Sequence, residues 1–192
     1  MRRDLFKELF RKSIHFCSAF IPLIDSWNHT FVLWALTGAV VMFCIEEFLR
    51  LNGHPVPLVS KITETAARKR DQGRFVLGPV TLCLGILTVL LVFPPMEAYL
   101  GIYALGLGDG IASLAGRFLG KNSIPYAGGK TIEGSAACFL IVFIAFSLVT
   151  RDLVSSAVLA LFTTIMEAFP LKDFDNLLIP VAVAVAARSF GF

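Results

Sequence analysis

Seven apolar stretches separated by short polar segments dominate the pattern along this chain. They cover roughly residues 14–27, 30–49, 75–93, 96–115, 132–149, 153–169 and 176–190. Several approach the ~20 residues that an α-helix needs to cross a hydrocarbon core of ~30 Å. Helices satisfy their own backbone polar groups where lipid offers no water. The pattern predicts an all-α, multi-pass integral membrane protein of about seven transmembrane helices, with residues 1–192 forming a single domain.

Composition supports the same class. Of the 192 residues, 56% are hydrophobic and 16% charged, and the mean hydropathy is +0.76. A soluble domain is nearer half apolar and a quarter charged. The four cysteines stand singly in apolar segments without C-x-x-C spacing, so we expect neither a disulfide framework nor a zinc site.

The cations predict an orientation. With seven spans, one side of the membrane receives the N-terminus and the loops 51–74, 116–131 and 170–175. Of the 17 Lys and Arg residues, only Arg151 and Arg188 fall on the other side. By the positive-inside rule we expect the N-terminus and these loops to be cytoplasmic, in the cell membrane.

Residues 1–13 have the pattern of an interfacial amphipathic helix. Leu5, Phe6, Leu9 and Phe10 share one helical face, with charges around them. Acidic residues interrupt the basic region, and no small-residue cleavage site follows. We therefore do not expect a removable signal peptide.

An acid, Asp109, lies near the end of the fourth apolar stretch, and small residues follow it at helical spacing. Gly116 and Gly120 form a GxxxG pair, which is typical of close helix packing. Packing alone does not require an acid, and ionisable groups near lipid are usually functional. We favour a second interpretation, in which the small residues let a phosphate approach the backbone while Asp109 holds a cation.

Two further segments carry candidate chemistry. In AGGKTIEGS (127–135), Gly128 and Gly129 permit close backbone approach, Lys130 supplies charge and Thr131 is placed to cap the next helix. In EAFPLKDFDNLLIP (167–180), acidic and amide side chains offer the oxygen ligands that a hard cation prefers. Together these features indicate magnesium-nucleotide handling, and hence phosphoryl or nucleotidyl transfer.

Basic residues complete the expected site. Arg11, Lys12 and His15 begin the first apolar stretch, and Lys69 and Arg70 lie in a cationic loop. Each group also has an interpretation that involves no catalytic site. Arg11 and Lys12 could anchor the helix at the membrane surface, and the cationic loop could contact anionic lipid headgroups.

The chain resembles the polyprenol kinase family, which contains dolichol kinase, phytol kinase and CTP-dependent diacylglycerol kinase. The similar segments are RKSIH (11–15), KRDQG (69–73), GDGIASLAGRFLGK (108–121), GGKTIEGS (128–135) and EAFPLKDFDNLLIP (167–180). Members are integral membrane enzymes that phosphorylate the hydroxyl of a lipid alcohol, typically from CTP with a divalent metal. The resemblance implies transfer of the γ-phosphoryl group of CTP, with Mg²⁺, to a polyprenol or dolichol, phytol or diacylglycerol.

Motifs and resemblance together define three expected sets. The expected catalytic residues are Asp109, Lys130 and Glu133, with Glu133 or Asp109 as the proton acceptor. The expected nucleotide-binding residues are Arg11, Lys12, His15, Lys69, Arg70, Gly116, Gly120, Lys121, Gly128, Gly129 and Thr131. The expected metal ligands are Asp109, Glu167, Asp175 and Asn176. The expected partners are the lipid alcohol, the nucleotide triphosphate and the bilayer, with no nucleic acid.

Two alternatives remain at this point. Phosphatidate cytidylyltransferases share the GD…GR.FGK…KT.EG core, but they close with KRxxKD, PGHGG and DRxD. Here the corresponding segment is PLKDFDNLLIP, which favours the kinase. A non-catalytic carrier of anionic lipids would use the same basic loops.

Overall fold

The computed structural model describes residues 2–54, 56, 57, 63, 65, 73–125, 127–170 and 174–191, without the side chains of residues 2–5. Its helices are α1 (Arg2–Ser18), α2 (Ile21–Asp25), α3 (His29–Leu51), α5 (Gly78–Val92), α6 (Pro95–Tyr103), η2 (Ala104–Asp109), α7 (Gly110–Leu119), α8 (Ile132–Thr150), α9 (Leu153–Ala168) and α10 (Asp175–Ser189). The structure is 80% helical, and the described residues contain no strand. The all-α prediction is confirmed.

Within the described ranges, three helical segments are long and apolar enough to cross a membrane. They are α3, the run Pro95–Leu119 formed by α6, η2 and α7, and α8. The helices α5 and α9 are apolar but shorter. A multi-pass integral membrane protein is confirmed, while the number of seven spans and the orientation remain predictions.

The first apolar stretch is not one helix. The helix α1 runs past residue 13, where we expected the interfacial helix to end, and continues to Ser18. The helix α2 then begins at Ile21, with Pro22 in its first turn, where proline is tolerated because its missing N–H would have no helical partner. Its last residue, Asp25, accepts a hydrogen bond from the Tyr99 hydroxyl at 2.9 Å, which ties α2 to α6.

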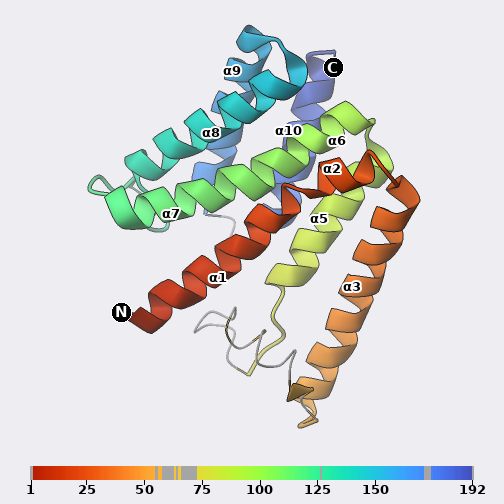
Figure 1. The fold of residues 1–192 in the computed structure, drawn as a ribbon. Helices are drawn as coiled ribbons and strands as arrows, with labels where there is room; N and C mark the ends of the chain where they lie inside the picture. Colours follow the sequence, from red (N-terminus) through yellow and green to blue (C-terminus); the bar gives the residue numbers. More distant parts are fainter. Residues whose placement is uncertain are drawn as a thin grey trace.

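The helices, arranged as in Figure 1, pack around two clusters of buried apolar residues in the described part of the chain. One core lies among α6, α8, α9 and α10 and includes Leu100, Phe146 and Leu159, all fully buried. The other lies among α3, α5 and α6 and includes Ile86 and Ile102. The helix α1 crosses η2 and α7, and α3 packs against α5 at the edge of the molecule.

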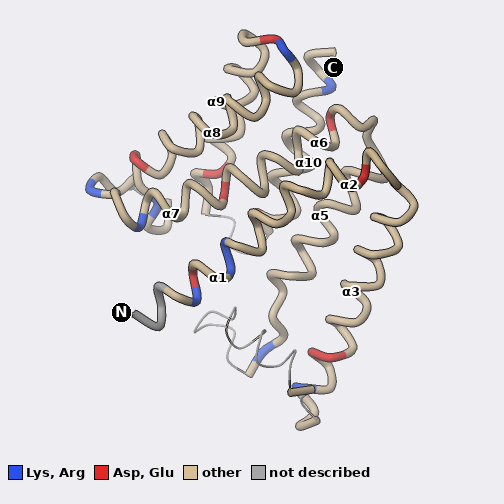
Figure 2. The backbone as a smooth tube through the Cα atoms, viewed as in Figure 1, with Lys and Arg blue, Asp and Glu red and all other residues tan. Residues whose placement is uncertain are grey.

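Charged residues collect at the two ends of the helices and are sparse between them (Figure 2). At one end lie the start of α1, the α7–α8 connection and the start of α10. Most of the described cations are at this end, whereas Arg151 and Arg188 follow α8 and end α10 at the other. The candidate site lies at the cation-rich end.

Candidate functional site

The long helix that carries Asp109 changes to π-helical geometry over Ala104–Asp109. Gly106 in this segment lies directly under α1, because a Cβ atom there would be 2.8 Å from Ser18 Oγ and 2.9 Å from the His15 carbonyl oxygen. Only glycine permits so close a crossing. Short π segments inside α-helices are frequent at functional sites, and this one ends on Asp109.

Asp109 is buried and paired with α1. Its Oδ2 atom accepts a hydrogen bond from Lys12 Nζ at 2.5 Å. His15 Nδ1 is 3.1 Å from the same oxygen but makes no hydrogen bond to it, so Lys12 is the principal partner. Asp109, Lys12 and His15 are 7%, 3% and 5% exposed. A charge this deeply buried is tolerated because a counter-charge accompanies it.

A second ion pair joins the α7–α8 connection to the end of α9. Lys130 Nζ is 2.8 Å from Glu167 Oε1 and also donates to the Glu167 carbonyl oxygen. Gly128 and Gly129 precede Lys130 with φ of 66° and 93°, a left-handed backbone that glycine adopts without steric cost. These two glycines turn the chain so that Lys130 reaches across to α9.

Thr131 caps α8, as its place in the sequence predicts. Its hydroxyl oxygen accepts from the Gly134 amide at 3.1 Å, and the Ile132 amide donates to the Asn122 carbonyl at 2.9 Å. Amides of this first turn are therefore engaged within the chain.

The small residues after Asp109 do provide close helix packing. A Cβ atom on Gly134 would lie 2.6 Å from the Ala112 carbonyl oxygen, and one on Gly120 would lie 2.7 Å from Thr131 Cγ2. The backbones of α7 and of the start of α8 are therefore in contact, with no room for a side chain between them. Gly116 shares this contact and also lines the cavity described next. The packing interpretation is therefore observed, while the approach of a phosphate to this surface stays a prediction.

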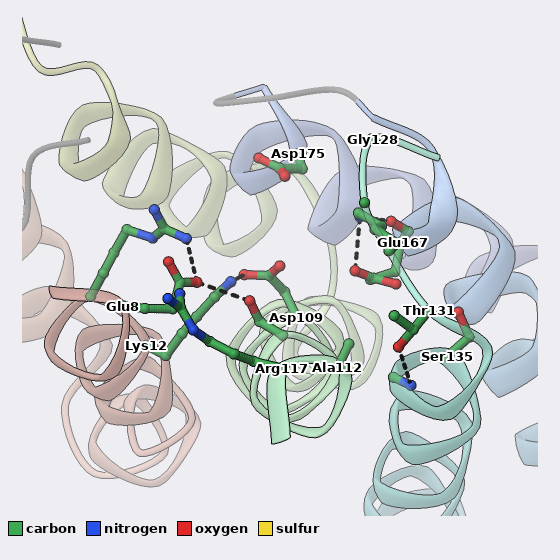
Figure 3. A pocket seen from close by; sticks show the side chains of 16 residues that line it. Glu8, Lys12, Asp109, Ala112, Arg117, Gly128, Thr131, Ser135, Glu167 and Asp175 are labelled. Atoms are coloured by element: carbon green, nitrogen blue, oxygen red, sulfur yellow. Dashed lines mark hydrogen bonds and ion pairs between the residues drawn. The ribbon is translucent and has the colours of Figure 1, made fainter. Parts of the chain in front are cut away.

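A cavity of about 430 Å³ separates the two ion pairs. Figure 3 shows Asp109 and Lys12 on one side of it, Glu167 and Thr131 on the other, and Asp175 above. The predicted site residues that line the cavity are Arg11, Lys12, Asp109, Gly116, Gly128, Gly129, Lys130, Thr131, Glu167 and Asp175. Segments far apart in the sequence therefore converge on one pocket.

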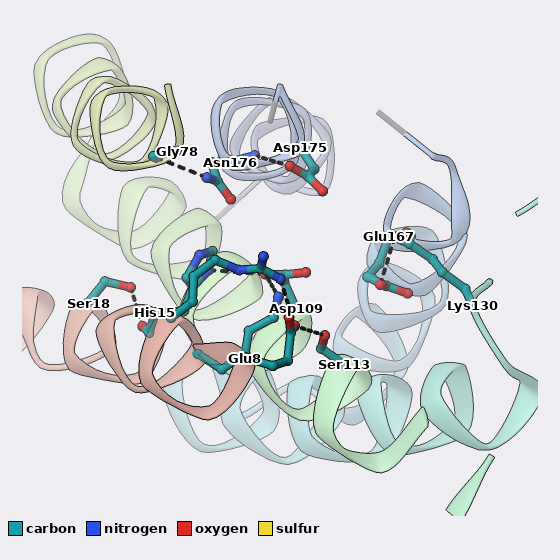
Figure 4. A network of polar contacts seen from close by, with 12 residues as sticks. Glu8, His15, Ser18, Gly78, Asp109, Ser113, Lys130, Glu167, Asp175 and Asn176 are labelled. Carbon is teal, nitrogen blue, oxygen red and sulfur yellow. Dashed lines mark hydrogen bonds and ion pairs between the residues drawn. The ribbon is translucent and has the colours of Figure 1, made fainter. Parts of the chain in front are cut away.

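Five predicted residues do not line the cavity: His15, Gly120, Lys121, Glu133 and Asn176. His15 Nδ1 lies 3.1 Å from Asp109 Oδ2, and the exposed Lys121 follows α7. Glu133 accepts from the Asn122 side chain at 2.9 Å. Asn176 donates to the Gly78 carbonyl oxygen at 3.2 Å and so joins α10 to α5 (Figure 4). Lys69 and Arg70 lie outside the described residues.

The cavity also contains residues that we did not predict as site residues. These are Glu8, Ala112, Ser113, Arg117, Gly134 and Ser135. Glu8 accepts from Arg11 Nη2 at 2.6 Å and from Ser113 Oγ at 2.9 Å, which connects α1 to α7 (Figure 4). Glu8 and Arg11 are three positions apart, a spacing that places two side chains next to each other on a helix, so the sequence could have indicated this ion pair. The amphipathic pattern alone places Glu8 only in the interfacial helix.

The carboxylates of the cavity suit a cation shared with a ligand. Among the described residues, no three His, Cys, Asp or Glu side chains are grouped closely enough to hold a metal by themselves. Mg²⁺ is usually bound by one or two carboxylates, with substrate phosphates and water completing its shell. Asp109, Glu167 and Asp175 line the cavity, so the donor set fits a phosphate-bound Mg²⁺.

Fold and site together define a helical membrane protein with a charged cavity at the cation-rich end of its helices. The chain is 29% identical over 164 residues to phytol kinase 1 of Arabidopsis thaliana. It is 30% identical over 195 residues to dolichol kinase of Saccharomyces cerevisiae, and 26% identical over 209 residues to a probable phytol kinase 1 of Oryza sativa. These relatives confirm the resemblance of the chain to the polyprenol and phytol kinase family.

The matches cover most of this chain but less of the relatives. They span 75%, 93% and 97% of the chain, and 54%, 36% and 65% of the Arabidopsis, yeast and rice proteins respectively. No family model and no solved structure matches the chain.

Proposed function

We propose that this protein is a lipid-alcohol kinase, which transfers the γ-phosphoryl group of a nucleoside triphosphate, CTP, to the hydroxyl of a membrane alcohol. Relatives named phytol kinase and dolichol kinase support the reaction class. The family resemblance supports CTP as the donor. A polyprenol or dolichol, phytol and diacylglycerol are the candidate acceptors.

The observation that carries the proposal is the pairing of charges around one cavity. Arg11, Lys12, Arg117 and Lys130 line it together with Asp109, Glu167 and Asp175. Phosphoryl transfer needs little covalent chemistry from the protein, because positioning and neutralisation of phosphate charge supply most of the catalysis. Cations on opposite walls suit the oxygens of a triphosphate.

In the proposed reaction the alcohol oxygen forms a bond to the γ-phosphorus, and the bond from that phosphorus to the β,γ-bridging oxygen breaks. The nucleoside diphosphate leaves, and a carboxylate accepts the hydroxyl proton. We assign that role to Asp109, since Glu133 does not line the cavity. Lys12 keeps the Asp109 side chain in place, and Lys130 and Arg117 face the phosphate oxygens.

Bound Mg²⁺ would neutralise charge on the phosphates. Asp175 and Glu167 would hold it, with Asp109 close to the transferred group. Of the residues predicted as metal ligands, Asn176 has no part in this scheme, because it does not line the cavity and its amide nitrogen donates to Gly78 of α5.

The test uses the purified chain in lipid nanodiscs and CTP labelled at the α or the γ position. The acceptors are a panel of lipid alcohols that includes phytol, a polyprenol and diacylglycerol, with phosphatidate as a separate acceptor. ATP is run in parallel. We expect lipid-bound label from γ-labelled CTP only. Label from the α position with phosphatidate would instead identify a cytidylyltransferase, and label from neither position would support a lipid carrier.

A further inference from the structure

Among the residues that the structure describes, three side-chain hydroxyls line the cavity, on Ser113, Thr131 and Ser135. Two of them are engaged within the protein, because Ser113 donates to Glu8 and Thr131 accepts from the Gly134 amide. The Ser135 hydroxyl is shielded from solvent and has no hydrogen-bond partner in the described part of the chain. Buried polar groups without a partner are rare in folded proteins, and each calls for an explanation.

The position of Ser135 supplies the explanation. It stands one turn into α8 beside Thr131 and is drawn among the cavity-lining side chains (Figure 3). One turn further along α8, Cys138 is fully buried, and Val142 beyond it belongs to the apolar core. Ser135 is therefore the last hydroxyl on this face of α8 before the face enters the apolar core.

From this geometry we infer that Ser135 binds the hydroxyl group of the acceptor alcohol. This inference rests on the proposed function and specifies how that site receives its second substrate. A serine hydroxyl is uncharged and both donates and accepts, which matches an alcohol that must accept one hydrogen bond while it gives up its proton. The phosphate oxygens have Arg11, Arg117 and Lys130 as stronger, charged partners.

The same helix provides a matched control. Ser147 also has a buried hydroxyl without a partner among the described residues, but it lies in the last turn of α8 and does not line the cavity. Replacing either serine by alanine removes the same atom from the same helix. Alanine has the higher helix propensity, so neither change is expected to lower the melting temperature.

The experiment measures kcat and KM for the alcohol and for the nucleotide in wild-type protein, Ser135→Ala, Ser135→Thr, Ser135→Cys and Ser147→Ala. Ser135→Ala should raise KM for the alcohol about fivefold, the effect of one neutral hydrogen bond, with KM for the nucleotide unchanged. Ser135→Thr, which keeps the hydroxyl, and Ser147→Ala should both behave like wild type. Ser135→Cys, a weaker hydrogen-bonding group of similar shape, should fall between alanine and serine.

Wild-type kinetics in Ser135→Ala, or a rise in KM for the nucleotide instead of the alcohol, would overturn the inference and leave the kinase reaction standing. Absence of transfer to any alcohol by the wild-type protein would remove both the proposed function and this inference.

Discussion

Lys12 in the N-terminal helix and Asp109 at the end of the π segment form a buried ion pair with Nζ 2.5 Å from Oδ2, although 97 positions separate them. The pair fixes α1 across the long helix at the point where Gly106 allows close approach. The N-terminal helix is consequently a wall of the cavity as well as an amphipathic segment.

Lys12→Met should destabilise the protein by about 3 kcal/mol, because it leaves the Asp109 carboxylate buried without its principal counter-charge. The double variant Lys12→Met/Asp109→Asn should recover much of that stability, since the uncompensated charge is gone. Denaturation of the detergent-solubilised variants measures the effect. Arg188→Met, which removes an exposed cation at the other end of the molecule, serves as the control. If Lys12→Met and Arg188→Met were equally stable, the ion pair would contribute nothing to stability.

Gly134→Ala should separate α7 from α8, because the added Cβ atom would lie 2.6 Å from the Ala112 carbonyl oxygen. We expect a loss of about 1–3 kcal/mol from this overpacking, together with reduced activity, since both helices line the cavity. Gly38→Ala in α3 is the matched change, because no atom lies within 4 Å of its added Cβ. Gly38→Ala should be neutral or stabilise the protein by up to about 1 kcal/mol. Similar melting temperatures for the two variants would contradict the close packing.

Much of the fold could be predicted because a membrane-spanning helix is a continuous run of apolar residues, which can be recognised in the sequence without knowledge of tertiary contacts. The apolar stretches 30–49 and 132–149 agree closely with α3 and α8. The break between α1 and α2 was missed, since hydropathy alone does not report a change of helix direction. The π segment was missed as well: it lies where α1 crosses Gly106, a long-range contact that a local pattern does not report.

The site was predictable where motif and polarity coincided, as at Asp109, Lys130 and Glu167. The ion-pair partner of Asp109 could not be predicted, because Lys12 reaches Asp109 only through the packing of α1 against the long helix. Asn176 resembled a metal ligand by residue type, yet its amide bonds to Gly78 and Thr81 of α5. In the sequence Arg117 is only one of the cations of the 116–131 loop, and the fold shows that it lines the cavity.

The orientation prediction can be tested by cysteine labelling in a variant whose four native cysteines are replaced by alanine. Lys121→Cys reports on the cation-rich end, and Val154→Cys reports on the start of α9, where the side chain is 75% exposed. In vesicles of known sidedness, a membrane-impermeant maleimide should label residue 121 from the cytoplasmic side and residue 154 from the opposite side. Labelling of both residues from one side would refute the topology.

The metal dependence has a specific expectation. Chelation with EDTA should abolish transfer, and added Mg²⁺ should restore it, because phosphate-bound Mg²⁺ relies on few protein ligands. Asp175→Asn should raise the Mg²⁺ concentration needed for half-maximal activity about tenfold. Asp152→Asn, which retains an N-capping side chain at the opposite end, should leave that concentration unchanged. Full activity in EDTA would exclude the metal from the reaction.

The most direct measurement is transfer of label from γ-labelled nucleotide to the lipid alcohol by Asp109→Asn, beside wild type and Asp152→Asn. Asparagine keeps the shape of the side chain and removes its charge. We expect kcat to fall by about 10²–10³-fold in Asp109→Asn, with correct membrane insertion and unchanged transfer by Asp152→Asn. Wild-type transfer by Asp109→Asn would contradict a phosphoryl-transfer site built around this carboxylate.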